Sequence, residues 1–332
     1  MTVIESVIEQ VKSQFIGDKF NQKEILDYKK AQKLAYIATQ FTATQLVEGM
    51  TEKEAAKIME DFLIEQGVEH FFHHSFVWFG VRSRFNNFSR LPLYGGLQQT
   101  IDSLSKVVNF GLPHFGKQFL PSNKKLEKNT VVILDVAPVV NGCAADVAYT
   151  YIFGNRPDAS QALKDLEPYR DLILEMVKKE KYLSEIYTAV DDLLKQQGYE
   201  SAHKVYPGEV LGHKIGKLPF LELPSLNILG FDAQSLTYLV GENIRAQFND
   251  FVTKGLGIFN NFGSTQKSPL WGPVSNYVAT PGLWAVEPHI AKSDFGVKWE
   301  EILVVTQNNA YWLDDDLPHV NSWQEGQSQK FN

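Results

Sequence analysis

Residues 131–153 read Val131-Val-Ile-Leu-Asp-Val-Ala-Pro-Val-Val-Asn-Gly-Cys-Ala-Ala-Asp-Val-Ala-Tyr-Thr-Tyr-Ile-Phe153, a largely apolar, β-type stretch that nevertheless contains two carboxylates, Asp135 and Asp146. Asn141-Gly142 predicts a two-residue hairpin turn, because a type I′ turn needs a positive φ at both central residues and Asn-Gly tolerates this best. The stretch is therefore predicted to be an antiparallel hairpin.

The register of this hairpin follows from its turn. It places Asp135 opposite Ala148 and Asp146 opposite Ala137. The two aspartates are then diagonal neighbours on one face, roughly 7 Å apart at the backbone, a gap that side chains can close around an ion. Two ionised carboxylates this close on a buried sheet repel each other and lose hydration, which a divalent metal between them would offset. Two aspartates on a solvent-facing side of the sheet are the alternative.

A second hairpin with acidic residues is predicted over residues 283–305. A turn centred on Ser293-Asp294 places Glu287 directly opposite Glu300, so this hairpin repeats the arrangement of the first. A register slip of one residue would bring Glu301 to the same face in place of Glu300. Exposed glutamates on an edge hairpin are the alternative for this pair.

An imidazole is added by Gly212-His-Lys-Ile-Gly216, where two glycines flank His213 and allow its backbone to come close to another group. A Gly-His pair alone is also typical of an ordinary loop. Taken together, four carboxylates and one imidazole suit two hard or borderline divalent ions about 3.5–4 Å apart that share carboxylates and a water.

Length and composition describe an ordinary globular protein of 332 residues, enough for one large or two ordinary domains. With 32 basic and 39 acidic residues and no block of Lys or Arg, nucleic acid and anionic membrane are excluded as main partners. Cys143 is the only cysteine, which excludes an intrachain disulfide and fits a reducing compartment. The first residues lack a secretion-signal pattern and no long apolar run occurs, so we expect a cytoplasmic protein without membrane spans.

Apolar residues at helical spacing predict four helices, over about 23–47, 51–67, 158–181 and 183–198. Thr51-Glu-Lys-Glu54 is a capping box that begins the second helix, and Asp158 or Ser160 is expected to cap the third. Sliding the second helix by 131 positions lays it on the fourth, which indicates duplicated halves. Chance is the alternative, since any two amphipathic helices that end at Gly can be aligned. An aromatic strand is predicted from His70 to Phe79.

These motifs, in this order, resemble those of the pita-bread metallopeptidase superfamily, which includes methionine aminopeptidase, aminopeptidase P, prolidase and the metal-free creatinase. That family has two aspartates eleven residues apart across a hairpin, a Gly-His-x-x-Gly, a Glu-Pro and a basic-x-Glu-acidic strand. The matching residues here are Asp135 and Asp146, Gly212 to Gly216, Glu287-Pro288 and Lys298-Trp-Glu-Glu301. The similarity extends from about Thr51 to about Trp312.

The resemblance implies an α+β pita-bread fold, with pseudo-twofold duplicated α/β halves, a curved antiparallel sheet and a central metal site. By similarity, Asp135 would hold one metal, His213 and Glu287 would help to hold the other, and Asp146 and Glu300 would bridge them. Glu301 then becomes a neighbour of the site rather than a ligand. We expect a helical segment over 1–50 packed on a catalytic domain over 51–332, without the amino-terminal recognition domain of prolidases and aminopeptidases P.

The activity implied is hydrolysis of peptide bonds in short peptides, similar to that of a Xaa-Pro dipeptidase or aminopeptidase, with two divalent ions of Mn, Co, Zn or Fe. Such ions lower the pKa of a shared water and stabilise the oxyanion. Glu287 or Glu300 would carry a proton to the leaving amine. His114, in Pro113-His-Phe115, matches a further family histidine that lies ahead of the first aspartate, and it is expected to be a catalytic residue. Competing candidates, each with a purely structural role as the alternative, are His73, His74 and His289.

Two departures from the family pattern leave the substrate open. Phe220 and Glu209 stand where many relatives carry histidines that act as neutral donors. The alternatives are therefore a metal-dependent hydrolase or lyase for a small non-peptide amide and a non-catalytic pita-bread binding protein. The 225–280 segment is hypothesised to form a lid or a substrate wall. A homodimer is one option for the oligomeric state.

Overall fold

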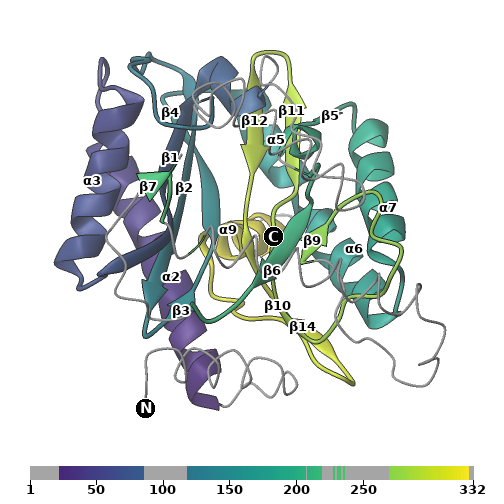
Figure 1. Ribbon diagram of the computed structural model, residues 1–332. Helices are drawn as coiled ribbons and strands as arrows, with labels where there is room; N and C mark the ends of the chain where they lie inside the picture. The colour runs from purple at the N-terminus through teal and green to yellow at the C-terminus, as the bar shows by residue number, and fades with distance from the viewer. Residues whose placement is uncertain are drawn as a thin grey trace, which may run out of the picture.

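The computed structural model describes residues 22–85, 118–206, 208–218, 227–228, 230–232, 235 and 269–328. Figure 1 shows two halves side by side, each made of antiparallel strands with helices along its outer face. The amino-terminal half carries α2 (Gln22–Gln45) and α3 (Glu52–Glu65). The carboxyl-terminal half is flanked by α5 (Pro157–Asp165), α6 (Glu167–Lys178) and α7 (Leu183–Gln196). This duplicated α+β arrangement confirms the predicted fold class.

The helices of the first half begin and end close to their predicted limits. α3 starts after Thr51, whose hydroxyl accepts a hydrogen bond from the Glu54 N–H while the Glu54 carboxylate accepts one from the Thr51 N–H, so the predicted capping box is confirmed. α2 packs against α3 and the first sheet, and its Tyr36 hydroxyl donates to the Glu300 carbonyl oxygen at 2.7 Å. The amino-terminal helix thus supports the backbone of a residue predicted to bind metal.

The first sheet has the strand order β3-β2-β1-β8-β7, with β4 also paired to β2. Its strands are β1 (His70–Phe79), β2 (Thr130–Val140), β3 (Cys143–Ala144), β4 (Val147–Phe153), β7 (Asn227–Ile228) and β8 (Phe231–Asp232). Asn141 and Gly142 have φ of 52° and 80°, as the predicted turn requires. Asp135 pairs with Ala148, which confirms the register derived from that turn. A short 3₁₀ helix, η1 (Gly80–Arg84), follows β1.

One predicted helix is wrong, because the span 158–181 forms two helices. α5 and α6 are separated at Leu166, two residues before Pro168. A proline in the helix interior removes a backbone hydrogen bond and its ring clashes with the preceding turn, so the chain starts a new helix there. The predicted capping residues are also wrong, because Arg156 is the N-cap of α5 and Asp158 pairs with its guanidinium instead.

The second half contains a five-stranded sheet in the order β14-β13-β10-β6-β9 and a three-stranded sheet in the order β12-β11-β5. The five strands of the first are β6 (Gly212–Ile215), β9 (Leu270–Trp271), β10 (Gly282–Val286), β13 (Glu301–Val305) and β14 (Ala310–Trp312). The three strands of the other are β5 (Glu200–Ser201), β11 (His289–Lys292) and β12 (Phe295–Lys298). A short 3₁₀ helix, η2 (His203–Val205), precedes β6, and α9 (Pro318–Ser328) follows β14 as the last described element.

The hairpin over 283–305 keeps its predicted register but divides between these two sheets. Val286 pairs with Glu301 in one sheet and His289 pairs with Lys298 in the other, and both pairs agree with the predicted turn. Glu287 and Glu300 lie in the break between the sheets, where neither belongs to a strand. The backbone at both residues therefore lies outside regular strand pairing, at the centre of the molecule.

The two halves are joined along β4. The Glu300 N–H donates to the Ala148 carbonyl oxygen at 2.9 Å, and the Thr150 hydroxyl bonds both the N–H and the carbonyl of Lys298, at 2.8 and 2.9 Å. Each half also has its own apolar core of buried side chains, with Met59 and Leu134 in the first and Tyr169 and Trp284 in the second. The junction itself is the place where polar groups from both halves meet.

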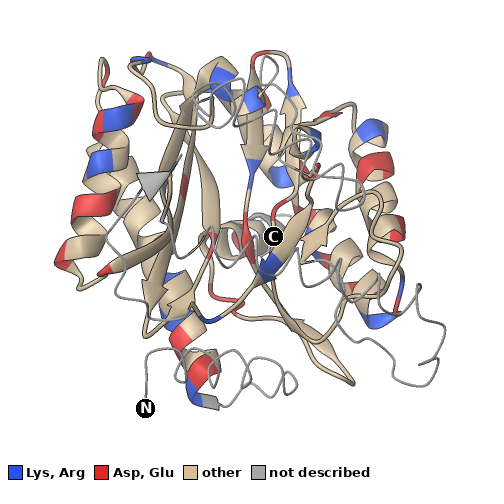
Figure 2. Cartoon of the chain, in the orientation of Figure 1, with Lys and Arg blue, Asp and Glu red and all other residues tan. Residues whose placement is uncertain are grey.

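The exposed helix faces carry charges of both signs. Figure 2 shows Lys and Arg mixed with Asp and Glu along α3 and α7. Among the helices of the described residues, none is both long enough and apolar enough to cross a membrane.

Gly212 is needed because β6 and β10 approach each other closely beside His213. A Cβ at Gly212 would lie 2.4 Å from the Ala285 carbonyl oxygen and 3.3 Å from the Val286 Cα. Both groups belong to backbone, which cannot rotate away. Gly212, the glycine that precedes the histidine in the sequence motif, therefore allows the two strands to come this close.

We expect Gly212→Ala to destabilise the protein by about 1–3 kcal/mol, because the added methyl group overpacks the two strands. Gly198→Ala is the matched control: Gly198 has a φ of 80° with open space around it, so the cost there is about 1–2 kcal/mol of backbone strain alone. Thermal melting and metal-binding titrations measure both variants. Only Gly212→Ala should also disturb metal binding, and equal metal binding by the two variants would contradict this role.

Candidate metal centre

The structure brings together the side chains of the five residues predicted as metal ligands. They come from β2, the β3–β4 link, β6, the residue after β10 and the residue before β13, and they are Asp135, Asp146, His213, Glu287 and Glu300. The four carboxylate residues are between 2% and 6% exposed. Ligand atoms of Asp146, His213 and Glu300 all lie within 4.8 Å of one another. Their function as ligands stays a prediction, but their convergence is what a shared metal site needs.

Lys298 supplies a positive charge at the centre of this cluster. Its ammonium lies 2.8 Å from a Glu287 oxygen, 3.0 Å from a Glu300 oxygen and 3.3 Å from Asp135 Oδ2. The residue is fully buried, and its position two residues before Glu300 in extended backbone places both side chains on the same side. The basic residue of the sequence motif therefore acts as an internal counter-ion for three carboxylates.

His73, on β1, is a site residue that the sequence analysis assigned no definite role. Its Nε2 lies 2.8 Å from Asp146 Oδ1 and 3.4 Å from Asp135 Oδ1. The residue is 4% exposed, and it forms with Asp135 and Asp146 a second group whose ligand atoms lie within 4.8 Å of one another. The cluster therefore holds two imidazoles, His73 and His213, rather than one.

The two imidazoles determine the charge of Asp146. Burial alone would raise the pKa of this carboxyl, but the ion pair with His73 and the hydrogen bond from His213 outweigh it and hold the pKa well below its usual range. In return, burial tends to lower the pKa of His73, yet the charge of Asp146 prevails and raises it to about 9. The pKa of His213 is raised for the same reason. Without metal, these shifts favour a charged His73 beside an ionised Asp146, and the pKa of His213 moves in the same direction as that of His73.

The remaining carboxyls are affected mainly by burial. Loss of hydration raises the pKa of Asp135 to about 6, although Lys298 and His73 oppose the shift. Burial, and then the charges of Asp146 and Glu287, raise the pKa of Glu300 well above its usual value. Without metal, Lys298 and His73 therefore offset part of the negative charge of the cluster, and burial favours the protonated form of Glu300.

The donor groups of this cluster fit divalent metal ions. Each imidazole donates a hydrogen bond from Nδ1 to the carbonyl oxygen of the next residue. The distance from Nδ1 to this oxygen is 2.8 Å for His73 and 3.1 Å for His213. This leaves both Nε2 atoms facing the acids, and a backbone carbonyl on the other ring nitrogen is the usual support of a metal-bound histidine. Carboxylate oxygens with imidazole nitrogens form a set that Mn, Co, Zn and Fe accept.

Other candidate residues lie apart from the cluster or outside the described residues. Glu301 points away and binds Arg170 at 2.7 Å and His319 at 3.1 Å, which agrees with the register that chose Glu300. His289 is buried, its Nδ1 lies 3.1 Å from the Tyr206 hydroxyl, and burial lowers its pKa well below the usual value. His74 faces the other way, 3.4 Å from Glu60 and stacked on Phe71.

Most of the positions that were compared with the family histidines lie outside the residues that the structure describes. His114 and Phe220 lie outside the described residues, as does most of the 225–280 segment. Glu209 is described, half-buried and held in left-handed backbone with a φ of 50°.

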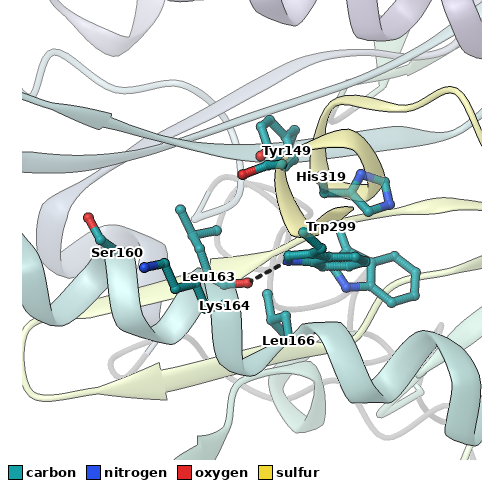
Figure 3. Close-up of a pocket in the computed structure, with 9 residues that line it drawn as sticks. Tyr149, Ser160, Leu163, Lys164, Leu166, Trp299 and His319 are labelled. Carbon is teal, nitrogen blue, oxygen red and sulfur yellow. Dashed lines mark hydrogen bonds between the residues drawn. The ribbon is translucent and has the colours of Figure 1, made fainter. Parts of the chain in front are cut away.

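A cavity of about 200 Å³ lies on the opposite side of the Lys298–Glu300 segment from the carboxylates. Trp299 points into it because alternate side chains of an extended segment face opposite ways. Figure 3 shows Trp299 and His319 at one side of the cavity and Leu163, on α5, at the other. The two rings stack with centroids 5.4 Å apart, and His319 also bonds Glu301. These aromatic side chains form a wall behind Glu300.

The structure is thus an α+β protein whose two halves enclose a buried cluster of carboxylates and imidazoles. Comparison with known proteins matches residues 27–307 to metallopeptidase family M24, a match that begins within α2. The chain belongs to this family, which confirms the resemblance drawn from the motifs.

Individual relatives agree with the family at low identity. Methionine aminopeptidase A of Synechocystis sp. is 26% identical over 127 residues, 38% of this chain and 46% of that protein. The X-Pro aminopeptidase of Thermotoga maritima is similar in structure, with a TM-score of 0.58 and 19% identity over 94% of this chain and 65% of that one. The prolidase of Pyrococcus furiosus has a TM-score of 0.56 at 18% identity, over 93% and 67%. The chain spans about half the length of the curated relative and about two thirds of these two structures, whose likeness concerns the fold.

Lys298→Met should destabilise the metal-free protein by about 3–5 kcal/mol, because three buried carboxylates lose the charge that compensates them. Divalent metal added to this variant should restore much of the loss, since the ions replace the missing charge. Melting temperatures with and without metal measure the effect. Lys57→Met removes only an exposed pair with Asp61 and should leave the melting temperature almost unchanged. A metal-free Lys298→Met protein as stable as the wild type would contradict the assigned role.

Metal binding should release protons near neutral pH, because a metal ligand must be deprotonated while the pKa values of His213 and Glu300 are raised in the metal-free protein. Affinity should therefore rise as the pH increases across the neutral range. Calorimetric titration with Zn²⁺ in two buffers of different ionisation enthalpy measures the released protons directly. Equal heats in both buffers, with an affinity independent of pH, would show that the ligands are already deprotonated.

Proposed function

We propose that this protein is a dinuclear metal-dependent hydrolase of peptide bonds. The observation that carries the proposal is the convergence of four buried carboxylates, one of which, Asp146, is contacted by two imidazoles. A binding protein without catalysis has no physical need to bury so many acids together, because each costs hydration energy that no internal contact fully returns. Membership of a metallopeptidase family supports the same conclusion.

Asp135, Asp146, His213, Glu287 and Glu300 are the residues that would hold two divalent ions of Mn, Co, Zn or Fe. When bound, such ions supply a water nucleophile near neutral pH and polarise the scissile carbonyl. We assign Asp146 and Glu300 as the ligands that both ions would share, because ligand atoms of these two residues and of His213 lie within 4.8 Å of one another. Manganese is the ion we would try first for activity.

The protein side chains would move and hold protons during the reaction. Burial and the neighbouring acids raise the pKa of Glu300, which favours a proton on this carboxyl, so we assign to it the transfer of a proton between the nucleophile and the leaving amine, with Glu287 as the neighbouring candidate. Lys298 keeps both carboxylates in place through contacts at 2.8 and 3.0 Å. His114 is proposed to contact the substrate carbonyl.

The proposed substrates are short peptides, in particular those with proline next to the cleaved bond. This choice is supported by solved structures of similar fold that are described as an X-Pro aminopeptidase and a prolidase. We also propose a reducing, cytoplasmic location. Its support is the single cysteine, Cys143, which is buried and whose thiol pKa is raised to about 11, so the thiol is unreactive.

Asp146→Asn tests the proposal, because it removes the charge at the centre of the cluster while keeping the shape of the side chain. It should abolish turnover of Xaa-Pro dipeptides assayed with Mn²⁺, Co²⁺, Zn²⁺ or Fe²⁺ added, and it should lower the bound metal. Asp191→Asn is the matched control: Asp191 is also a buried aspartate held by a histidine, His203, and a lysine, Lys204, but it lies on α7.

Metal analysis of the gently purified wild type completes the test. Wild-type protein that binds no divalent ion under any of these conditions would rule out a metal-dependent hydrolase. Turnover of small amides without turnover of dipeptides would replace the peptide substrate, and metal binding without any turnover would indicate a binding protein.

A further inference from the structure

We infer that His73 is a sixth metal ligand, which gives each of the two metal positions one imidazole. This inference rests on the proposed function, because it assumes that the cluster binds two ions. Nothing in the motif set requires a ligand from β1, since the five expected donors all come from later in the chain. Three observations point to His73. They are its distances to the two aspartates, the hydrogen bond that orients its ring, and a buried carboxylate oxygen beside it that lacks a hydrogen-bond partner.

The ligand atoms of the cluster fall into two groups that share Asp146. One group contains His73, Asp135 and Asp146, and the other contains Asp146, His213 and Glu300. His73 Nε2 approaches one oxygen of Asp146 at 2.8 Å, while His213 Nε2 approaches the other at 3.2 Å. A carboxylate contacted from both sides in this way is placed to bridge two ions, each with its own imidazole.

The two histidines are also supported alike. Each lies on the strand that pairs with the acidic strand of its own half, His73 opposite Ala137 on β2 and His213 opposite Ala285 on β10. Each directs Nδ1 to the carbonyl oxygen of the next residue, so Nε2 points at the acids. An ion can therefore replace the proton on Nε2 of His73 without any rotation of the ring.

An unsatisfied atom marks the place where the ion would bind. Within the described part of the chain, Asp135 Oδ1 is buried without a hydrogen-bond partner, and it lies 3.4 Å from His73 Nε2. Lys298 contacts the other oxygen of the same carboxylate, Oδ2. A buried, unpaired carboxylate oxygen is costly, and an ion between Oδ1 and the imidazole would satisfy both atoms.

A ligand at His73 changes the chemistry of its metal position. With Asp135, Asp146 and Glu300 alone, that position would be made of oxygens, which suit Mn²⁺ and Mg²⁺. With an added imidazole, both positions become mixed nitrogen and oxygen sites, which favour Zn²⁺, Co²⁺ and Fe²⁺. The class of ion that His73 selects is therefore a borderline transition metal at both positions.

His73→Ala tests the inference through metal binding, measured by calorimetry and by elemental analysis with Co²⁺ and with Mn²⁺. The wild type should bind two Co²⁺ ions. The variant should lose one of them or bind it at least about tenfold more weakly. Removing a residue that only supports a metal ligand already weakens metal binding by about tenfold or more, and loss of a ligand should cost at least as much. The loss should be larger for Co²⁺ than for Mn²⁺, and the visible absorption of bound Co²⁺ should change.

His74→Ala is the matched control, because it removes the adjacent imidazole on the other face of β1 but keeps the carbonyl that supports His73. It should bind two Co²⁺ ions like the wild type. Two ions bound by His73→Ala with wild-type affinity and spectrum would overturn the inference and leave the dinuclear proposal intact. A wild type that binds no metal would instead overturn the proposed function.

A measurement on the wild type covers the case in which His73→Ala does not fold. Protein labelled with ¹⁵N at its eight histidines is titrated with Zn²⁺ and followed by NMR. Two histidines should change from the protonated to the metal-bound state at Nε2. A change in one histidine only would overturn the inference.

Discussion

The burial of four carboxylates at one point is the constraint on which the rest of the structure depends. Each acid lost most of its hydration when it entered the junction between the halves, and the charges repel one another at these distances. Such a cluster can exist only if positive charge comes with it. In the metal-free protein, Lys298 and His73 supply positive charge, and the raised pKa values of His213 and Glu300 favour the protonated forms of both side chains.

The backbone is arranged so that these acids can meet. Asp146 lies in the link between β3 and β4, and Glu287 and Glu300 lie where the second hairpin passes from one sheet to another. At such breaks a side chain is not held perpendicular to a continuous sheet, so acids from different strands can turn toward a common point. Hydrogen bonds from α2 and β4 then fix the Glu300 backbone on both sides.

Most of this arrangement could be predicted because the turns are local. Asn141-Gly142 and Ser293-Asp294 each fix a register within a few residues, and both registers hold in the structure. The break of the second hairpin and the division of one helix at Pro168 were not predicted, because an apolar pattern shows that a segment is buried but not where it bends.

His73 shows where such prediction stops. Its position depends on how β1 pairs with β2, two strands separated by about 50 residues, and that pairing is shifted on both sides of His73. Three consecutive residues of β1, Phe71 to His73, are buried, so the alternation that would reveal the inward face is missing. No local signal reports such an irregularity, and the histidine could be placed only by the structure.

Internal cations have a consequence for how metal and folding are coupled. In a small zinc domain the metal supplies the energy of folding, and the protein unfolds without it. Here Lys298 and His73 already carry positive charge beside the acids, and each half has its own apolar core. Two divalent ions could replace the protons of the imidazoles and of Glu300 while Lys298 stays charged. Lys298 would then remain as a counter-charge beside the ions, so the cluster would exchange protons for metal without needing a different fold.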